Sequence, residues 1–202
     1  MTASNPIQQR LMDIYGKTRG SEAWQRIAPL IEAFPQQAPR RDGFFSEKVV
    51  VLITYGDSIR QEGQVALQTL HAFARVYLLD VFSAIHFLPF FPWSSDDGFS
   101  VKDFMAIDPQ LGDWEDVARI GRDFTLMFDY VVNHVSAQSQ WFQDYLAAKP
   151  GFANLAIEMD PGTDLSMVTR PRALPLLTEF TKQSGEAVHV WTTFSDDQID
   201  LN

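Results

Sequence analysis

The sequence predicts an α/β protein built around a parallel β-sheet. Three short apolar runs alternate with three stretches of helical apolar spacing, an order typical of parallel strands joined by right-handed crossovers. Hydrophobic residues make up 46% of the 202 residues, which is enough to form a core. A complete (β/α)8 barrel needs about 250 residues. We therefore expect this chain to be the front part of a longer protein.

Residues 1–48 are predicted to form a helical extension. Asn5 and Pro6 fit the start of a helix, and Gly16 fits its end. Ser21 is a candidate cap for a second helix, whose apolar face recurs at helical spacing until Pro35. We expect these two helices to form a hairpin that is followed by a loop over residues 36–48.

Residues 49–149 carry the alternating pattern and are predicted to form three βα units. The strands are expected to be buried on both faces of the sheet, because each run is continuously apolar. They are predicted at residues 49–54, 85–89 and 124–132. The helices are predicted at residues 65–78, 113–121 and 136–148, with Asp113 and Ser136 capping the last two.

The alternation stops after Pro150. Residues 150–202 have no strong period and contain one plausible strand, at 187–193, before an acidic segment. We expect this region to be an incomplete insertion after the third βα unit.

Charge and composition exclude several classes of function. The chain has 16 basic and 26 acidic residues, a net charge of −10, which argues against binding to nucleic acid or to an anionic membrane. Cysteine is absent, so disulfides and thiolate chemistry are excluded. The longest apolar run, residues 84–92, is too short to span a bilayer, and no signal peptide is recognised. We expect a cytoplasmic protein.

Polar side chains follow each predicted strand, where parallel sheets bind their ligands. Asp57 follows the first strand, Asp96 and Asp97 follow the second, and Asp129 ends the third, with His134 shortly after. His134 is either a ligand-binding or a structural histidine. Asp129 is either a general base or a hydrogen-bonding partner of a neighbouring strand.

The remaining candidates also have two interpretations each. The Asp96–Gly98 segment could hold a cation or hydroxyl groups, or it could be a turn with positive φ at Gly98. Arg170 and Arg172 could clamp a phosphate or carboxylate, or lie in solvent. The aromatic rings of Trp93, Phe99 and Phe194 could form a platform on which a sugar stacks, or they could pack in the core. No phosphate-binding glycine loop, nucleophile elbow or metal-binding histidine spacing is present.

Several segments together resemble the sucrose phosphorylase-like branch of glycoside hydrolase family 13, the α-amylase family. The resemblance covers about three quarters of the chain, and the helical extension and WSSDDGFS most resemble the glucosylglycerate phosphorylase type. The segments that carry it are LITYGDS (52–58), HFLPFFPWSSDDGFSVKDF (86–104), LGDWEDV (111–117), LMFDYVVNHVSAQSQWFQDYL (126–146), TRPRALPLL (169–177) and VWTTFSDDQIDLN (190–202).

The resemblance implies the N-terminal part of a (β/α)8 TIM barrel, with the start of a domain B inserted after the third strand. It implies retaining transfer of a glucosyl unit from an α-glucoside to inorganic phosphate, which gives α-glucose 1-phosphate. The expected partners are therefore the α-glucoside and phosphate, with no cofactor or metal. The nucleophile and the acid/base are expected beyond residue 202, so we expect no turnover by this chain alone.

The resemblance also assigns roles to individual residues. Asp96 and His134 resemble ligands of the glucosyl ring, and Phe99 resembles a residue beside that subsite. Arg172, with Arg170 near it, resembles part of the loop that meets phosphate or the acceptor. On the acceptor side, the resemblance places Phe194 and Gln198.

Two other functions remain open from the sequence. An amylase-like enzyme would hydrolyse the α-glucoside, and Asn133 matches a position that helps to hold calcium in many amylases. A sugar-binding fragment would bind the α-glucoside without catalysis.

Overall fold

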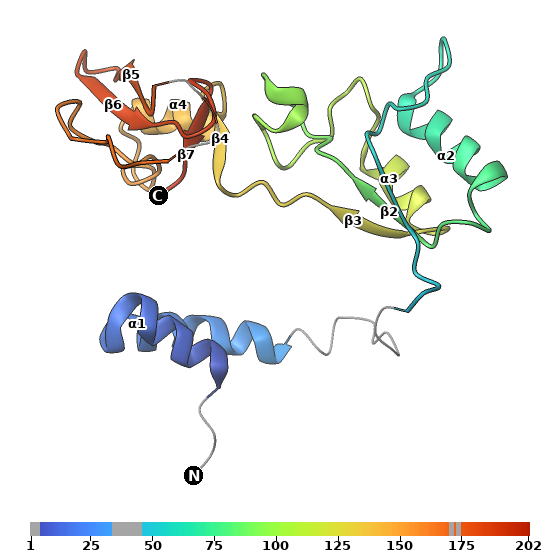
Figure 1. The fold of residues 1–202 in the computed structure, drawn as a ribbon, viewed down its shortest axis with the longest axis horizontal. Coiled ribbons are helices and arrows are strands. Elements are labelled where there is room, and N and C mark those ends of the chain that lie inside the picture. The colour runs from blue at the N-terminus through green and yellow to red at the C-terminus, as the bar shows by residue number, and fades with distance from the viewer. Residues whose placement is uncertain (1–4, 34–45, 170–171, 173–174) are drawn as a thin grey trace. The chain divides into compact units, whose positions relative to one another are not determined.

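The computed structural model of the protein describes residues 5–33, 46–169, 172 and 175–202 (Figure 1). The chain divides into two compact units, Met1–Phe45 and Ser46–Asn202. In the described ranges, none of the helices has both the length and the apolar character needed to cross a membrane.

The first unit contains the helix α1 (Pro6–Ala33). Its backbone leaves the helical conformation at Gly16, with φ of 76°, where the sequence predicts a helix end. A side chain at Gly20 would lie 2.5 Å from the Cα of Met12, so the two arms of the helix pack closely there. The predicted hairpin is therefore confirmed, but the helix resumes before Ser21, the expected cap. Phe34 and Pro35 lie outside the described residues.

The second unit begins with a parallel sheet in the order β1-β2-β3, as the sequence predicts. Each crossover contains one α-helix, and α3 begins after the predicted cap Asp113. The side chains of Asp113 and Asp116 each accept a hydrogen bond from the other's backbone N–H, which forms a capping box. The elements are β1 (Val51–Thr54), α2 (Ala66–Tyr77), β2 (Ala84–Phe87), α3 (Trp114–Ile120) and β3 (Thr125–Phe128).

The helices cover one face of this sheet. Leu52, Ile85 and Leu126 are partners across the three strands, and they pack in one core with apolar residues of α2 and α3. On the opposite face, Ile53 is 62% exposed and Met127 is 42% exposed. The prediction that all three strands are buried on both faces is therefore wrong for the described part of the chain, which covers only the helix face.

The third predicted helix starts later than expected. Ser136 does not cap it, because Ser136 ends the strand β4 (His134–Ser136). The helix is α4 (Gln140–Leu146), and the side chain of Ser139 caps it by accepting from the N–H of Phe142. The difference has a tertiary cause: β4 pairs antiparallel with β7 (Gln198–Asp200), a distant partner that a local pattern does not reveal.

A second core forms around α4 and the last strands. The strand predicted at 187–193 is confirmed as β6 (Ala187–Trp191), and it pairs antiparallel with β5 (Leu177–Thr181). Sequence periodicity missed both β5 and β7. The buried residues of this core are Val135, Phe142, Tyr145, Ala156, Val188, Val190 and Ile199.

Candidate functional site

The loop after β2 holds Asp96 in an unusual backbone conformation. Asp96 and Asp97 have φ of 58° and 51°, in the left-handed region that non-glycine residues adopt rarely and that aspartate tolerates better than most. Gly98 has φ of 100°, and a side chain there would lie 2.9 Å from the carbonyl oxygen of Pro89. The predicted turn at Gly98 is confirmed, and its strain is typical of functional loops.

Two antiparallel strands bring His134 and Gln198 to this loop. His134 begins β4 and Gln198 begins β7, and both side chains are buried. The Nε2 of Gln198 donates to the Oδ2 of Asp96 at 3.0 Å and lies 3.1 Å from the Nε2 of His134. The structure therefore brings together three of the predicted site residues. His134 lies on β4 rather than at the end of β3, where the sequence predicts it.

The hydrogen bonds of His134 are incompatible in a single state. Its Nε2 also lies 3.0 Å from the carbonyl oxygen of Phe99, to which it can bond only when it carries a hydrogen. The Gln198 amide nitrogen can donate to the same Nε2 only when that hydrogen is absent. The Nδ1 of His134 is buried without a partner among the described residues. The hydroxyl of Ser195 donates to the Oε1 of Gln198 at 2.8 Å, and with the amide in this orientation one polar contact of the imidazole is left unmade.

Burial and neighbouring groups fix the charge states of this cluster. Burial lowers the pKa of His134 below its usual value, so the imidazole is neutral at pH 7. A hydrogen bond from Arg172, at 2.8 Å, lowers the pKa of Asp96, and the bond from Gln198 acts in the same direction. The cluster therefore combines one carboxylate, one neutral imidazole and one amide.

The predicted aromatic platform does not form as a unit. The ring of Phe194 lies 5.0 Å from the ring of His134, while Phe99 packs against the first core. Trp93 lines a separate pocket. Within the described ranges, no pair of rings links Trp93, Phe99 and Phe194. Arg170 lies outside the described residues.

Asp129 directly follows β3 and faces a histidine on β2, the neighbouring strand in the sheet. One of its oxygens, Oδ1, lies 3.2 Å from the Nε2 of His86 on β2, which matches the structural alternative predicted for Asp129. Its other oxygen, Oδ2, is buried with no hydrogen-bond partner in the described part of the chain.

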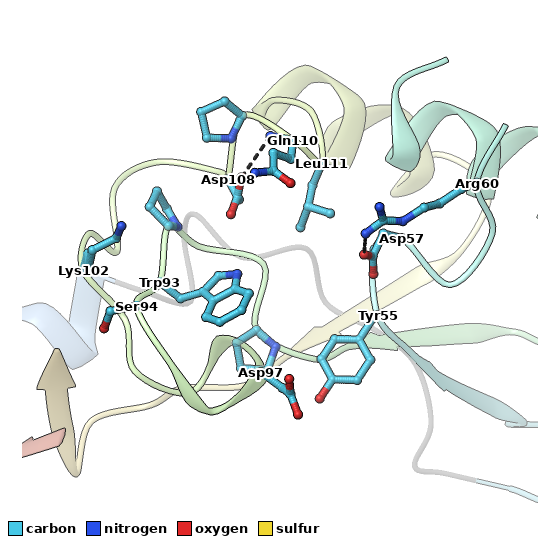
Figure 2. A pocket seen from close by; sticks show the side chains of 14 residues that line it. Tyr55, Asp57, Arg60, Trp93, Ser94, Asp97, Lys102, Asp108, Gln110 and Leu111 are labelled. Carbon is cyan, nitrogen blue, oxygen red and sulfur yellow. Dashed lines mark hydrogen bonds and ion pairs between the residues drawn. The ribbon is translucent and has the colours of Figure 1, made fainter. Parts of the chain in front are cut away.

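A pocket of about 580 Å³ lies beside the cluster (Figure 2). Figure 2 shows Trp93 in its middle, with Tyr55 and Asp97 close together below it. Burial and the nearby carboxylates, Asp97 foremost, raise the pKa of Tyr55. The sequence singled out Asp57, Trp93 and Asp97 but did not predict that they line one pocket, because the charged residues of this pocket are scattered along the chain. They include Asp57, Arg60, Lys102 and Asp108, whereas Asp96 and His134 do not line it.

Comparison with known proteins identifies the family. Residues 77–188 match the family model described as alpha amylase, catalytic domain. The chain belongs to the α-amylase family. This membership confirms the predicted fold class: the sheet β1-β2-β3 is the N-terminal part of a TIM barrel.

Curated relatives of this chain include phosphorylases. The chain is 53% identical over 196 residues to a glucosylglycerate phosphorylase of Allomeiothermus silvanus, covering 97% of this chain and 35% of the relative. It is 47% identical over 197 residues to that of Escherichia coli, with the same coverage of 97% and 35%. The chain therefore spans about a third of the length of these curated relatives.

A solved structure is similar to most of this chain. The crystal structure of sucrose 6F-phosphate phosphorylase from Thermoanaerobacter thermosaccharolyticum superposes with a TM-score of 0.69. The two sequences are 34% identical, and the match covers 78% of this chain and 34% of that chain.

Proposed function

We propose that the protein is a retaining phosphorylase. It cleaves an α-glucoside of the glucosylglycerate or sucrose type with inorganic phosphate and releases α-glucose 1-phosphate. Phosphorylases of both types are among the relatives, and the relatives at 53% and 47% identity are glucosylglycerate phosphorylases by name. We place the reaction in the cytoplasm, since a chain without cysteine suits a reducing compartment.

The cluster of Asp96, His134 and Gln198 carries this proposal. A sugar hydroxyl both donates and accepts hydrogen bonds, so it can accept from one group of the cluster while donating to another. His134 has one polar contact that the protein itself leaves unmade, and a bound sugar hydroxyl can satisfy it. Asp96 adds a charged acceptor, which forms stronger hydrogen bonds than a neutral one.

The remaining predicted residues take roles around this cluster. Phe99, whose carbonyl oxygen lies 3.0 Å from the Nε2 of His134, lies beside the glucosyl subsite, and Phe194 shapes the acceptor side next to the His134 ring. Gln198, which the resemblance placed on the acceptor side, is assigned to the glucosyl subsite instead, because it contacts both Asp96 and His134. Arg172, with Arg170, offsets a net charge of −10 for an incoming phosphate. In the described structure Arg172 is paired with Asp96, so phosphate binding would draw it away from the donor subsite.

Product analysis tests the proposal. The product of the whole coding sequence that includes these 202 residues is incubated with α-glucosylglycerate or sucrose, with and without inorganic phosphate. We expect α-glucose 1-phosphate only when phosphate is present, and no turnover by residues 1–202 alone. Release of free glucose at the same rate with and without phosphate would identify a hydrolase. Binding without any turnover by the whole product would identify a sugar-binding protein.

Replacement of Arg172 by alanine separates phosphate use from donor binding. Loss of one charge-assisted hydrogen bond to phosphate costs ~1.5–3 kcal/mol, so we expect the KM for phosphate to rise about 10- to 100-fold. Donor affinity should change by less than about twofold, since Asp96 loses a competing partner. Initial rates at varied phosphate measure this, with Arg122→Ala as a control for the charge. Equal losses for phosphate and donor would contradict the assignment.

A further inference from the structure

One carboxylate next to the cluster collects hydroxyl groups from distant parts of the chain. The Oδ2 of Asp197 accepts from the hydroxyls of Ser94 and Ser95 at 2.5 Å and from Ser100 at 2.8 Å. Its Oδ1 lies 3.4 Å from the hydroxyl of Ser136. Four hydroxyl groups therefore surround this one carboxylate, three of them at Oδ2 and one at Oδ1.

These serines belong to the segments that carry the site residues. Ser94 and Ser95 immediately precede Asp96, and Ser100 follows it in the same loop. Ser136 ends β4, the strand that begins with His134. Asp197 itself directly precedes Gln198, whose side chain contacts both Asp96 and His134.

Backbone contacts reinforce the same junction. The carbonyl oxygen of Asp197 accepts from the N–H of Ala137 at 2.8 Å and lies 3.1 Å from the hydroxyl of Ser100, whose single hydrogen is shared between this carbonyl and Oδ2. The N–H of Ser136 donates to the carbonyl of Val101, which joins β4 to the loop after η2 (Asp96–Gly98). The loop, β4 and β7 therefore meet at Asp197.

We infer that Asp197 is a positioning residue for the glucosyl subsite. Its carboxylate holds the loop of Asp96 and the strand of His134 against Gln198, and it need not touch the sugar. The strained backbone at Asp96 requires such support, because residues in this conformation persist only where the surroundings fix them. The inference deepens the proposed function and rests on it for the identity of the ligand.

Two variants of Asp197 and one control variant of the adjacent residue test the inference. Asp197→Ala removes the carboxylate, and Asp197→Asn retains one acceptor oxygen. Asp196→Ala is the matched control, since Asp196 is adjacent, carries the same charge and is exposed. NMR at fixed pH compares the Gln198 side-chain amide and the His134 ring in each variant, and calorimetry with α-glucosylglycerate gives the affinity.

We expect Asp197→Ala to shift the resonances of Gln198 and His134 and to weaken glucoside binding by about 10- to 100-fold, the loss expected when a hydrogen bond to a charged group is misplaced. Asp197→Asn should lie between it and the wild type, and Asp196→Ala should match the wild type. Unchanged resonances in Asp197→Ala would overturn the inference. Wild-type protein that binds no glucoside would overturn the proposed function instead, while the resonances still decide the role of Asp197.

A milder variant covers the case in which Asp197→Ala does not fold. Within the described ranges, the hydroxyl of Ser95 bonds to Asp197 and to no other group, so Ser95→Ala removes one donor and keeps the charge. We expect shifted Gln198 and His134 resonances with a smaller loss of affinity. Wild-type resonances in Ser95→Ala would count against the inference.

Discussion

Asp96→Asn is expected to reduce kcat/KM for the α-glucoside donor by about 100-fold or more. The Asp96 carboxylate is proposed to accept two charge-assisted hydrogen bonds from hydroxyls of the glucosyl unit. Each such bond contributes ~1.5–3 kcal/mol. Asparagine tolerates the left-handed backbone that Asp96 adopts, so the variant tests the charge and not the turn. Steady-state kinetics with α-glucosylglycerate at saturating phosphate measures the effect.

Asp97→Asn provides the matched control. Asp97 shares the left-handed conformation and the charge of its neighbour, but it lines the adjacent pocket and not the cluster. We expect its kcat/KM for the donor to remain within about threefold of wild type, because surface charges contribute little. Equal losses in the two variants would show that the loop acts as a whole and that Asp96 has no special role.

Phe142→Ala is expected to have the largest effect on stability. Phe142 is fully buried at the centre of the second core, with its ring 4.8 Å from Phe180 and 5.3 Å from Tyr145. Truncation of a buried phenylalanine lowers the free energy of unfolding by about 3–5 kcal/mol. Urea denaturation followed by circular dichroism measures the change.

The neighbouring Trp141 gives a control for Phe142→Ala. Its side chain is large but 43% exposed, so Trp141→Ala should cost clearly less than Phe142→Ala. The same core packs Val135 and Ile199, which lie on the strands of His134 and Gln198, so Phe142→Ala should also weaken glucoside binding. Equal destabilisation by the two variants would contradict the proposed position of this core.

Local sequence patterns predicted most of the first βα units. The capping box at Asp113, the strands β1 to β3 and their parallel order follow from spacing and apolar runs that are visible within short windows. Patterns of this kind failed where pairing is distant. Residues 134–136 form a strand by pairing with residues 198–200, which a short window of sequence does not reveal. The local pattern therefore placed the start of the following helix too early, at Ser136.

The candidate site was predictable in part, and mainly through the family resemblance. The resemblance assigned Asp96 and His134 to the glucosyl ring and Gln198 to the acceptor side. The structure instead brings Gln198 into contact with both, across 102 positions of sequence in the case of Asp96. Asp197 was missed, because no local signal marks an acid whose partners are serines of other segments. The serines that flank Asp96 are visible in the sequence, but only the fold shows that they surround Asp197.

The central claim is that Asp96, His134 and Gln198 together bind a glucosyl unit. An NMR titration of the 202-residue chain with α-glucosylglycerate tests it most directly. We predict saturable shifts at the Gln198 side-chain amide and the His134 ring that are strongly weakened in His134→Ala and in Asp96→Asn. Shifts confined to Tyr55 and Trp93 in the adjacent pocket, or no shifts at all, would contradict the claim.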